Sequence, residues 1–172
     1  MILLTNNEVS DKMNIYLEKV ENEKKDILYR LLEYSLYGES LNDGNEMNDE
    51  GVFVYNHFED YFNEDDRHAF FIKEIESNKL LGFVMFNKYV QKVDDGHSIA
   101  EYMVIPKYRK NHIGKKVAFE CFDMFPGYWE VSPSFGSESA YLFWNKVINE
   151  YTEGNNKFDD GIFIFENKIK KK

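Results

Sequence analysis

Two adjoining segments are the most informative about the fold. They are the strand-like run Ile99-Ala100-Glu101-Tyr102-Met103-Val104 and, beyond Pro106, the basic loop Tyr108-Arg109-Lys110-Asn111-His112-Ile113-Gly114-Lys115. After the loop, apolar residues recur at helical spacing from Ile113 to Phe125. A strand that leads through a loop into a helix presents the first backbone N–H groups of that helix, together with the positive end of its dipole. Such a helix start can bind phosphate groups.

The charge of this loop is opposite to that of the chain as a whole. The 172 residues include 31 acidic and 21 basic side chains, for a formal net charge of −10, yet Arg109, Lys110, Lys115 and Lys116 lie together. The loop therefore predicts either an anion site or a solvated basic surface over a core helix, and charge alone leaves both open. The overall acidity argues against nucleic-acid binding, because phosphate contacts need a basic face.

Length and composition favour one globular domain. No linker or repeat divides the chain, so we expect a single domain over residues 1–172. Its apolar runs are too short to span a membrane, and no secretory signal precedes them, which predicts a cytoplasmic protein without membrane association. The single cysteine, Cys121, is expected to pack in the core, and the scattered histidines show no metal spacing, so we expect no metal site.

Hydrophobic periodicity and turn residues predict strands and helices on both sides of the central segments. The expected strands cover residues 1–5, 69–75, 80–87, 98–105, 128–131 and 161–166, and the expected helices cover 23–37, 113–125 and 138–149. Gly38 is expected to end the first helix, and the polar, acidic residues 39–51 to form a loop. This order of elements predicts a mixed α/β domain.

Three segments carry a family resemblance. Residues 106–115 resemble motif A of the GNAT N-acetyltransferases, in which Arg/Gln-x-x-Gly-x-Gly/Ala follows the fourth strand. Leu80-Leu81-Gly82-Phe83-Val84 resembles the third strand of that family, and Ser137-Glu138-Ser139-Ala140-Tyr141-Leu142-Phe143-Trp144 resembles its later element with an aromatic pair. Residues 30–37 and 53–55 resemble a bacterial branch of acetyltransferases. The resemblance covers most of the chain.

The resemblance implies a fold and a co-substrate. The fold would be a splayed, mixed, mostly antiparallel sheet of about six to seven strands flanked by about four helices, open between residues 98–105 and 128–131. The co-substrate would be acetyl-CoA. Met103 and Val104 would contact its pantetheine arm and thioester. The other implied contacts are Arg109, Lys110, Asn111, His112, Ile113, Gly114 and Lys115 around the pyrophosphate, with Ser137 and Trp144 nearby.

Three residues depart from the family pattern. His112 stands at the first loop glycine, which permits positive φ, although Asn111 beside it tolerates a left-handed conformation. His112 either donates a ring N–H to phosphate or is an exposed loop residue. Ser137 replaces an Asn and should still cap its helix. Trp144 replaces a catalytic Tyr; because an indole is no general acid, we expect Trp144 to pack in the core.

For the catalytic groups, the sequence leaves more than one assignment open. Glu101 interrupts an otherwise apolar strand, so it is either the general base that deprotonates the amine or a residue that alternation points to solvent or an ion pair. Tyr141, Tyr102 or water would protonate the departing thiolate.

The favoured function is direct acetyl transfer to a primary amine of a small molecule or peptide, by a monomer or homodimer. Nine Asp or Glu residues and no Lys or Arg between Asn42 and Asp66 favour a cationic amine. The competing interpretations are a non-catalytic acyl-CoA-binding or regulatory module on the same fold, and a structural domain without a cofactor.

Overall fold

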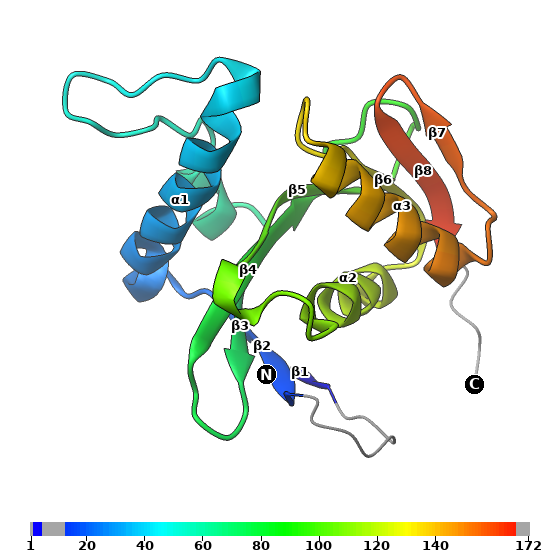
Figure 1. The fold of residues 1–172 in the computed structure, drawn as a ribbon, viewed down its shortest axis with the longest axis horizontal. Helices are drawn as coiled ribbons and strands as arrows, with labels where there is room; N and C mark the ends of the chain where they lie inside the picture. Colours follow the sequence, from blue (N-terminus) through cyan, green and yellow to red (C-terminus); the bar gives the residue numbers. More distant parts are fainter. Residues whose placement is uncertain (1, 5–12, 168–172) are drawn as a thin grey trace.

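The computed structural model of the protein describes residues 2–4 and 13–167. This part forms a mixed α/β fold around one eight-stranded sheet, with the strand order β1-β2-β3-β4-β5-β6-β8-β7 (Figure 1). The strands are β1 (Ile2–Leu4), β2 (Ile15–Lys19), β3 (Arg67–Glu74), β4 (Leu80–Asn87), β5 (His97–Val104), β6 (Gly127–Val131), β7 (Lys157–Asp159) and β8 (Ile162–Asn167). The helices are α1 (Lys25–Asp43), α2 (Ile113–Met124) and α3 (Glu138–Thr152), with short 3-10 turns at η1 (Asn22–Lys24), η2 (Glu59–Phe62) and η3 (Pro106–Tyr108).

Helices cover both faces of the sheet (Figure 1). On one face, α2 and α3 pack through Val117, Phe122 and Val147 against a core that includes Trp129 and Phe163. On the other face, α1 and the segment before β3 form a second core around Leu28, Leu32, Phe58, Phe71 and Phe83. Each amphipathic helix thus buries its apolar stripe against the sheet.

The sheet is antiparallel except where β5 meets β6. Their parallel pairing is limited to residues 97–99 opposite residues 129–131. Strand β5 then continues to Val104, whereas β6 ends at Val131, so the two strands part. The predicted opening between these strands is confirmed, and so is the mixed, mostly antiparallel α/β fold.

A β-bulge in β5 decides which way its side chains point. Met85 of β4 pairs with Glu101, but its neighbour Phe86 pairs with Ile99, which leaves Ala100 as an extra residue. Ile99 belongs to the core under α2 and α3, and regular alternation would place Glu101 there too. The bulge instead turns Glu101 to the α1 face, which Met103 also faces.

The structure corrects the expected end of the first helix. Helix α1 does not end at Gly38; it continues to Asp43 and ends at Gly44, which has a φ of +74°. A glycine inside a helix costs only about 1 kcal/mol, whereas a left-handed residue ends it, so Gly44 is the stop signal. The expectation of a loop from residue 39 was therefore wrong.

Strands β2 and β7 were not expected, which brings the sheet to eight strands; the described residues form three α-helices rather than four. Both missed strands are short, at 5 and 3 residues, and therefore give little periodic signal. The expected first strand is present as Ile2–Leu4, while Met1 and Thr5 lie outside the described residues.

Candidate functional site

The candidate site lies where β5 parts from β6. Beyond Ile99, the backbone of β5 has no strand partner on its β6 side, so its polar groups face the opening. Met103 and Val104, both nearly buried, form this end of the strand. On the opposite side, Gly82 of β4 lets the two backbones pair closely, since a Cβ there would lie 2.0 Å from the Met103 carbonyl oxygen.

The loop after β5 is tied back to the strand by Arg109. Its Nε donates a hydrogen bond to the Val104 carbonyl oxygen at 2.9 Å, so this guanidinium holds the loop against the strand. Lys110 and His112 have φ values of +68° and +58°. Asn111, which tolerates a left-handed conformation, does not adopt one; its two neighbours do, and His112 has the positive φ that a glycine at this position would permit.

The start of α2 offers unused backbone donors. The first hydrogen bond at this end of the helix runs from Lys116 N to His112 O at 3.1 Å, so the N–H groups of Ile113, Gly114 and Lys115 have no acceptor within the helix. The His112 side chain does not cap them. These amides, with the positive end of the helix dipole behind them, can bind an anionic group such as a phosphate.

The side chains next to those amides have other partners. Lys115 Nζ lies 2.7 Å from Glu150 Oε1 of α3. Gly114 lies against the Phe143 ring, which a Cβ would approach to 3.0 Å, and its carbonyl oxygen accepts a 2.6 Å hydrogen bond from the Tyr102 hydroxyl. In this structure, Gly114 thus allows α2 to pack against α3 and β5.

The three candidate residues at the start of α3 and within it have different surroundings. Ser137 caps the helix as expected, because its Oγ accepts a hydrogen bond from Ala140 N at 3.3 Å. Trp144 is 5% exposed and packs edge-on against Tyr102, which confirms the prediction of a core residue. Tyr141 packs against Phe158 and Phe163, so its ring faces β7 and β8, whereas Glu101 faces α1.

Glu101 lies in a largely apolar and acidic setting. Burial raises the pKa of its carboxyl group to about 8, and the negative charges of Glu39 and Asp43 add to this, while hydrogen bonding with Tyr55 lowers the pKa in part. A group with this pKa is mostly protonated at neutral pH but can lose and regain its proton readily. The strand position that stood out in the sequence therefore carries a carboxyl group suited to proton transfer.

The C-terminal end of α1 meets the loop between β6 and α3. Ser134 Oγ donates a 2.7 Å hydrogen bond to Glu39 Oε1, and a Cβ on Gly136 would lie 3.1 Å from the Asn42 side chain. Glu39 was missed as a candidate because the sequence placed it in a loop. Its position one turn before Asp43 becomes apparent only once α1 is known to continue past Gly38.

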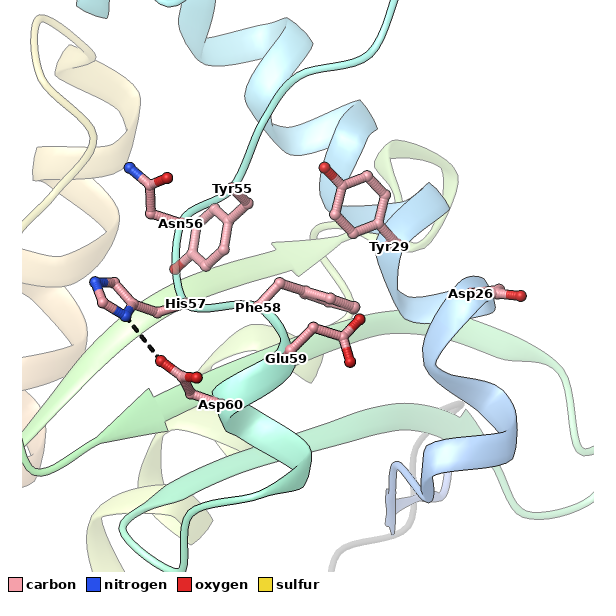
Figure 2. A pocket seen from close by; sticks show the side chains of 8 residues that line it. All are labelled: Asp26, Tyr29, Tyr55, Asn56, His57, Phe58, Glu59 and Asp60. Carbon is pink, nitrogen blue, oxygen red and sulfur yellow. Dashed lines mark hydrogen bonds and ion pairs between the residues drawn. The ribbon is translucent and has the colours of Figure 1, made fainter.

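An open pocket is lined by residues of α1 and of the segment that leads into and forms part of η2 (Figure 2). Its lining residues are Asp26, Tyr29, Tyr55, Asn56, His57, Phe58, Glu59 and Asp60. Two of its acidic side chains have partners: His57 Nδ1 lies 2.7 Å from Asp60, and Lys25 Nζ lies 2.8 Å from Glu59. Tyr55 belongs both to this pocket and to the surroundings of Glu101.

The family assignment follows from the sequence profile of the Acetyltransferase (GNAT) family, which matches residues 34–130, more than half of the chain. The chain belongs to the GNAT family and is an acetyl-CoA-dependent acetyltransferase. No curated protein shows significant sequence similarity to it.

Solved structures share the fold. An acetyltransferase from Thermus thermophilus has a TM-score of 0.63 at 14% identity over 89% of this chain and 97% of that one. A GNAT acetyltransferase from Streptococcus agalactiae has a TM-score of 0.61 at 7% identity, over 91% and 98%. An aminoglycoside acetyltransferase from an uncultured soil metagenomic sample, solved with sisomicin, has a TM-score of 0.55 at 15% identity, over 77% and 86%.

Two further observations concern the described residues only. Within residues 2–4 and 13–167, no three His, Cys, Asp or Glu side chains form a group that could hold a metal ion. In the same part of the chain, no helix combines the length and the apolar character needed to cross a bilayer.

Proposed function

We propose that this protein transfers the acetyl group of acetyl-CoA to a primary amine by direct attack within a ternary complex. The observation that carries the proposal is the position of Glu101. The bulge in β5 turns its carboxyl group toward α1, two residues before Met103 and beside the opening between β5 and β6. A carboxyl group with a pKa of about 8 is suited to accept a proton from an ammonium group near neutral pH.

The opening and the α2 start would hold the co-substrate. Met103, Val104 and the unpaired edge of β5 would bind the pantetheine arm, and the amides of Ile113, Gly114 and Lys115 its pyrophosphate. Arg109 would act mainly by holding the loop of residues 109–112 against Val104. Ser137 and Trp144 would support this site through the helix cap and the core. Acetyl-CoA supplies an acetyl group activated as a thioester.

Glu101 would accept the proton that the reacting amine must lose. The neutral nitrogen then attacks the acetyl carbon, and backbone N–H groups near Val104 would stabilise the oxyanion. Burial raises the pKa of Tyr102 well above its usual value, and its hydroxyl proton is already donated to Gly114. Because Tyr141 faces β7 and β8, we favour water as the proton source for the departing thiolate.

The test is thiol release from acetyl-CoA with a panel of primary amines. Glu101→Gln should lower kcat/KM by about 10²–10⁴-fold and remove the rise in rate toward pH 8, because general-base catalysis contributes a factor of this order. The thermal shift caused by CoA should persist in the variant. An unchanged pH–rate profile would rule out Glu101 as the base. CoA binding without turnover of any amine would instead indicate a non-catalytic acyl-CoA-binding module.

A further inference from the structure

The side chain of Tyr102 connects the two parts of the proposed co-substrate site. It lies on β5 beyond Ile99, the last residue of that strand that pairs with β6, and packs on the face covered by α2 and α3. Its hydroxyl group donates a 2.6 Å hydrogen bond to the Gly114 carbonyl oxygen in the first turn of α2. A residue of the strand that would bind pantetheine thus contacts the helix turn that would bind the pyrophosphate.

The Tyr102 ring is held in one place by two aromatic residues of α3. It packs edge-on against Trp144, with ring centroids 5.0 Å apart, and stacks on Phe143 at 6.0 Å. Phe143 also touches Gly114, where a Cβ would lie 3.0 Å from the Phe143 ring and 3.7 Å from the Tyr102 hydroxyl oxygen. Because the ring is rigid and carries its polar group at the tip, it acts as a spacer of fixed length between β5 and α2.

Other contacts at the start of α2 do not define its distance from β5 in this way. Residues 109–112 of the connecting loop are exposed. Ile113 is buried, but apolar burial is not directional. Lys115 is paired with Glu150 of α3, and such partly exposed ion pairs contribute little. The directional contact between the first turn of α2 and β5 is therefore the hydrogen bond from Tyr102.

We infer that Tyr102 is a positioning residue that sets the spacing between the pantetheine and pyrophosphate subsites. This inference rests on the proposed function, because it takes the edge of β5 and the amides of α2 as those subsites. A ligand that spans two subsites gains affinity from both only when their spacing matches its own length. CoA has to meet this condition, whereas either half of CoA alone does not.

The substitution Tyr102→Phe removes the hydroxyl group and keeps the ring in its aromatic stack. A carbonyl oxygen has two lone pairs, and the Gly114 oxygen lies where it can also accept a bond from the helix backbone, so it is not left without a donor. The variant is therefore expected to fold. Tyr151→Phe is the matched control, because the Tyr151 hydroxyl donates a bond of the same 2.6 Å length to Asp123 near the other end of α2.

Calorimetry with CoA and with its two halves, pantetheine and 3′-phospho-ADP, measures the effect on binding. Tyr102→Phe should weaken CoA binding about tenfold, which corresponds to about 1.4 kcal/mol, and should leave the affinity for each half almost unchanged. Tyr151→Phe should change none of the three affinities. Unchanged CoA affinity in Tyr102→Phe would overturn the inference. So would an equal loss for CoA and 3′-phospho-ADP, because it would indicate a damaged phosphate subsite and not a changed spacing.

Thiol release distinguishes this inference from the proposed function. With acetyl-CoA as donor, Tyr102→Phe should raise KM about tenfold and change kcat little, whereas with acetyl-pantetheine it should behave like wild type. A lower kcat at unchanged KM would overturn the inference, because Tyr102 would then act in the chemical step. If Tyr102→Phe weakens CoA binding as expected but wild type acetylates no amine, the proposed function fails and the inference stands. If wild type does not bind CoA, both fail.

Discussion

At the scale of single residues, His112 adopts a left-handed backbone conformation at the position where the motif resemblance has a glycine. Its φ of +58° lies in the left-handed region, which costs a non-glycine residue about 1–2 kcal/mol. The neighbouring Asn111, which tolerates this region better, does not adopt it. The loop geometry at the start of α2 is therefore set by its surroundings: Arg109 holds one end of the loop against Val104, and Ile113 is buried at the other.

His112→Gly should stabilise the protein by about 0.5 kcal/mol, because the relieved strain slightly exceeds the extra entropy of glycine in the unfolded chain. The measurement is the free energy of unfolding in urea. Asn111→Gly is the matched control: its φ is not positive, so glycine should lower stability there by about 0.5–1 kcal/mol. Shifts of the same sign in the two variants would contradict this account.

Glu130 is a second residue whose environment is unusual. Its side chain is 1% exposed, and its carboxylate accepts hydrogen bonds from the backbone N–H groups of Gln91, Lys92 and Val93 at 2.8, 2.6 and 3.1 Å. One buried carboxylate on β6 thereby holds the loop that leads into β5. Such charge-assisted hydrogen bonds are stronger than neutral ones.

Glu130→Gln should destabilise the protein by about 3 kcal/mol, since an amide has one acceptor oxygen and its NH₂ group would face a backbone donor. Urea unfolding monitored by tryptophan fluorescence would measure the loss. Asp94→Asn, an exposed change in the same loop, should have little effect. A loss below about 1 kcal/mol for Glu130→Gln would show that the loop does not depend on these bonds.

At the scale of elements, two glycines in regular structure have opposite roles. A Cβ added to Gly38, inside α1, would have no atom within 4 Å, whereas a Cβ on Gly82 of β4 would collide with the Met103 carbonyl oxygen of β5. The first glycine only weakens its helix, and the second is required for the pairing of the strands that form the site.

Gly38→Ala should therefore raise the free energy of unfolding by about 1 kcal/mol, as expected for alanine inside a helix. Gly82→Ala should lower it by about 3 kcal/mol or more, because the backbone of β5 has to shift. Circular dichroism during urea unfolding would measure both changes. Wild-type stability of Gly82→Ala would mean that β4 and β5 can separate locally without cost.

At the scale of the whole molecule, buried ionisable groups give stability two opposing pH dependences. Burial lowers the pKa values of His68 and His97, and His97 is stacked between Phe125 and Trp129 with neither ring nitrogen hydrogen-bonded to a described residue. As pH falls below about 6.5, the unfolded chain takes up protons that the folded protein does not, so stability decreases. For Glu101 the folded state holds the proton more tightly, so stability decreases as pH rises from about 4.5 to about 8.

Melting temperatures measured from pH 5 to pH 9 should separate the two effects. His97→Phe should reduce the loss of stability on the acid side, because phenylalanine keeps the aromatic stacking but cannot take up a proton. Glu101→Gln should instead become more stable relative to wild type as pH rises toward 8 and should differ little near pH 5. The same shift at every pH for either variant would show that its titration is not linked to folding.

Local patterns were enough to predict most elements. The hairpin of β3 and β4, the apolar face of α2 and the cap of α3 at Ser137 follow from periodicity and from residue types a few positions apart. Short strands such as β7 carry too few residues for such a signal. The predicted end of α1 was wrong because Gly38 resembles a stop signal, whereas the helix continues to Asp43 and ends at the left-handed Gly44.

By itself, the sequence determined the order of strand, basic loop and helix, the likeness to GNAT acetyltransferases, and Glu101 as an acidic residue in an apolar strand. Only the tertiary structure decided which face Glu101 occupies, because the bulge depends on the register between β4 and β5. It also paired Lys115 with Glu150 and brought Glu39 and Asp43 to a residue about sixty positions away. The physical reason is that periodicity and capping act over a few residues, whereas burial, register and charge proximity depend on partners distant in the chain.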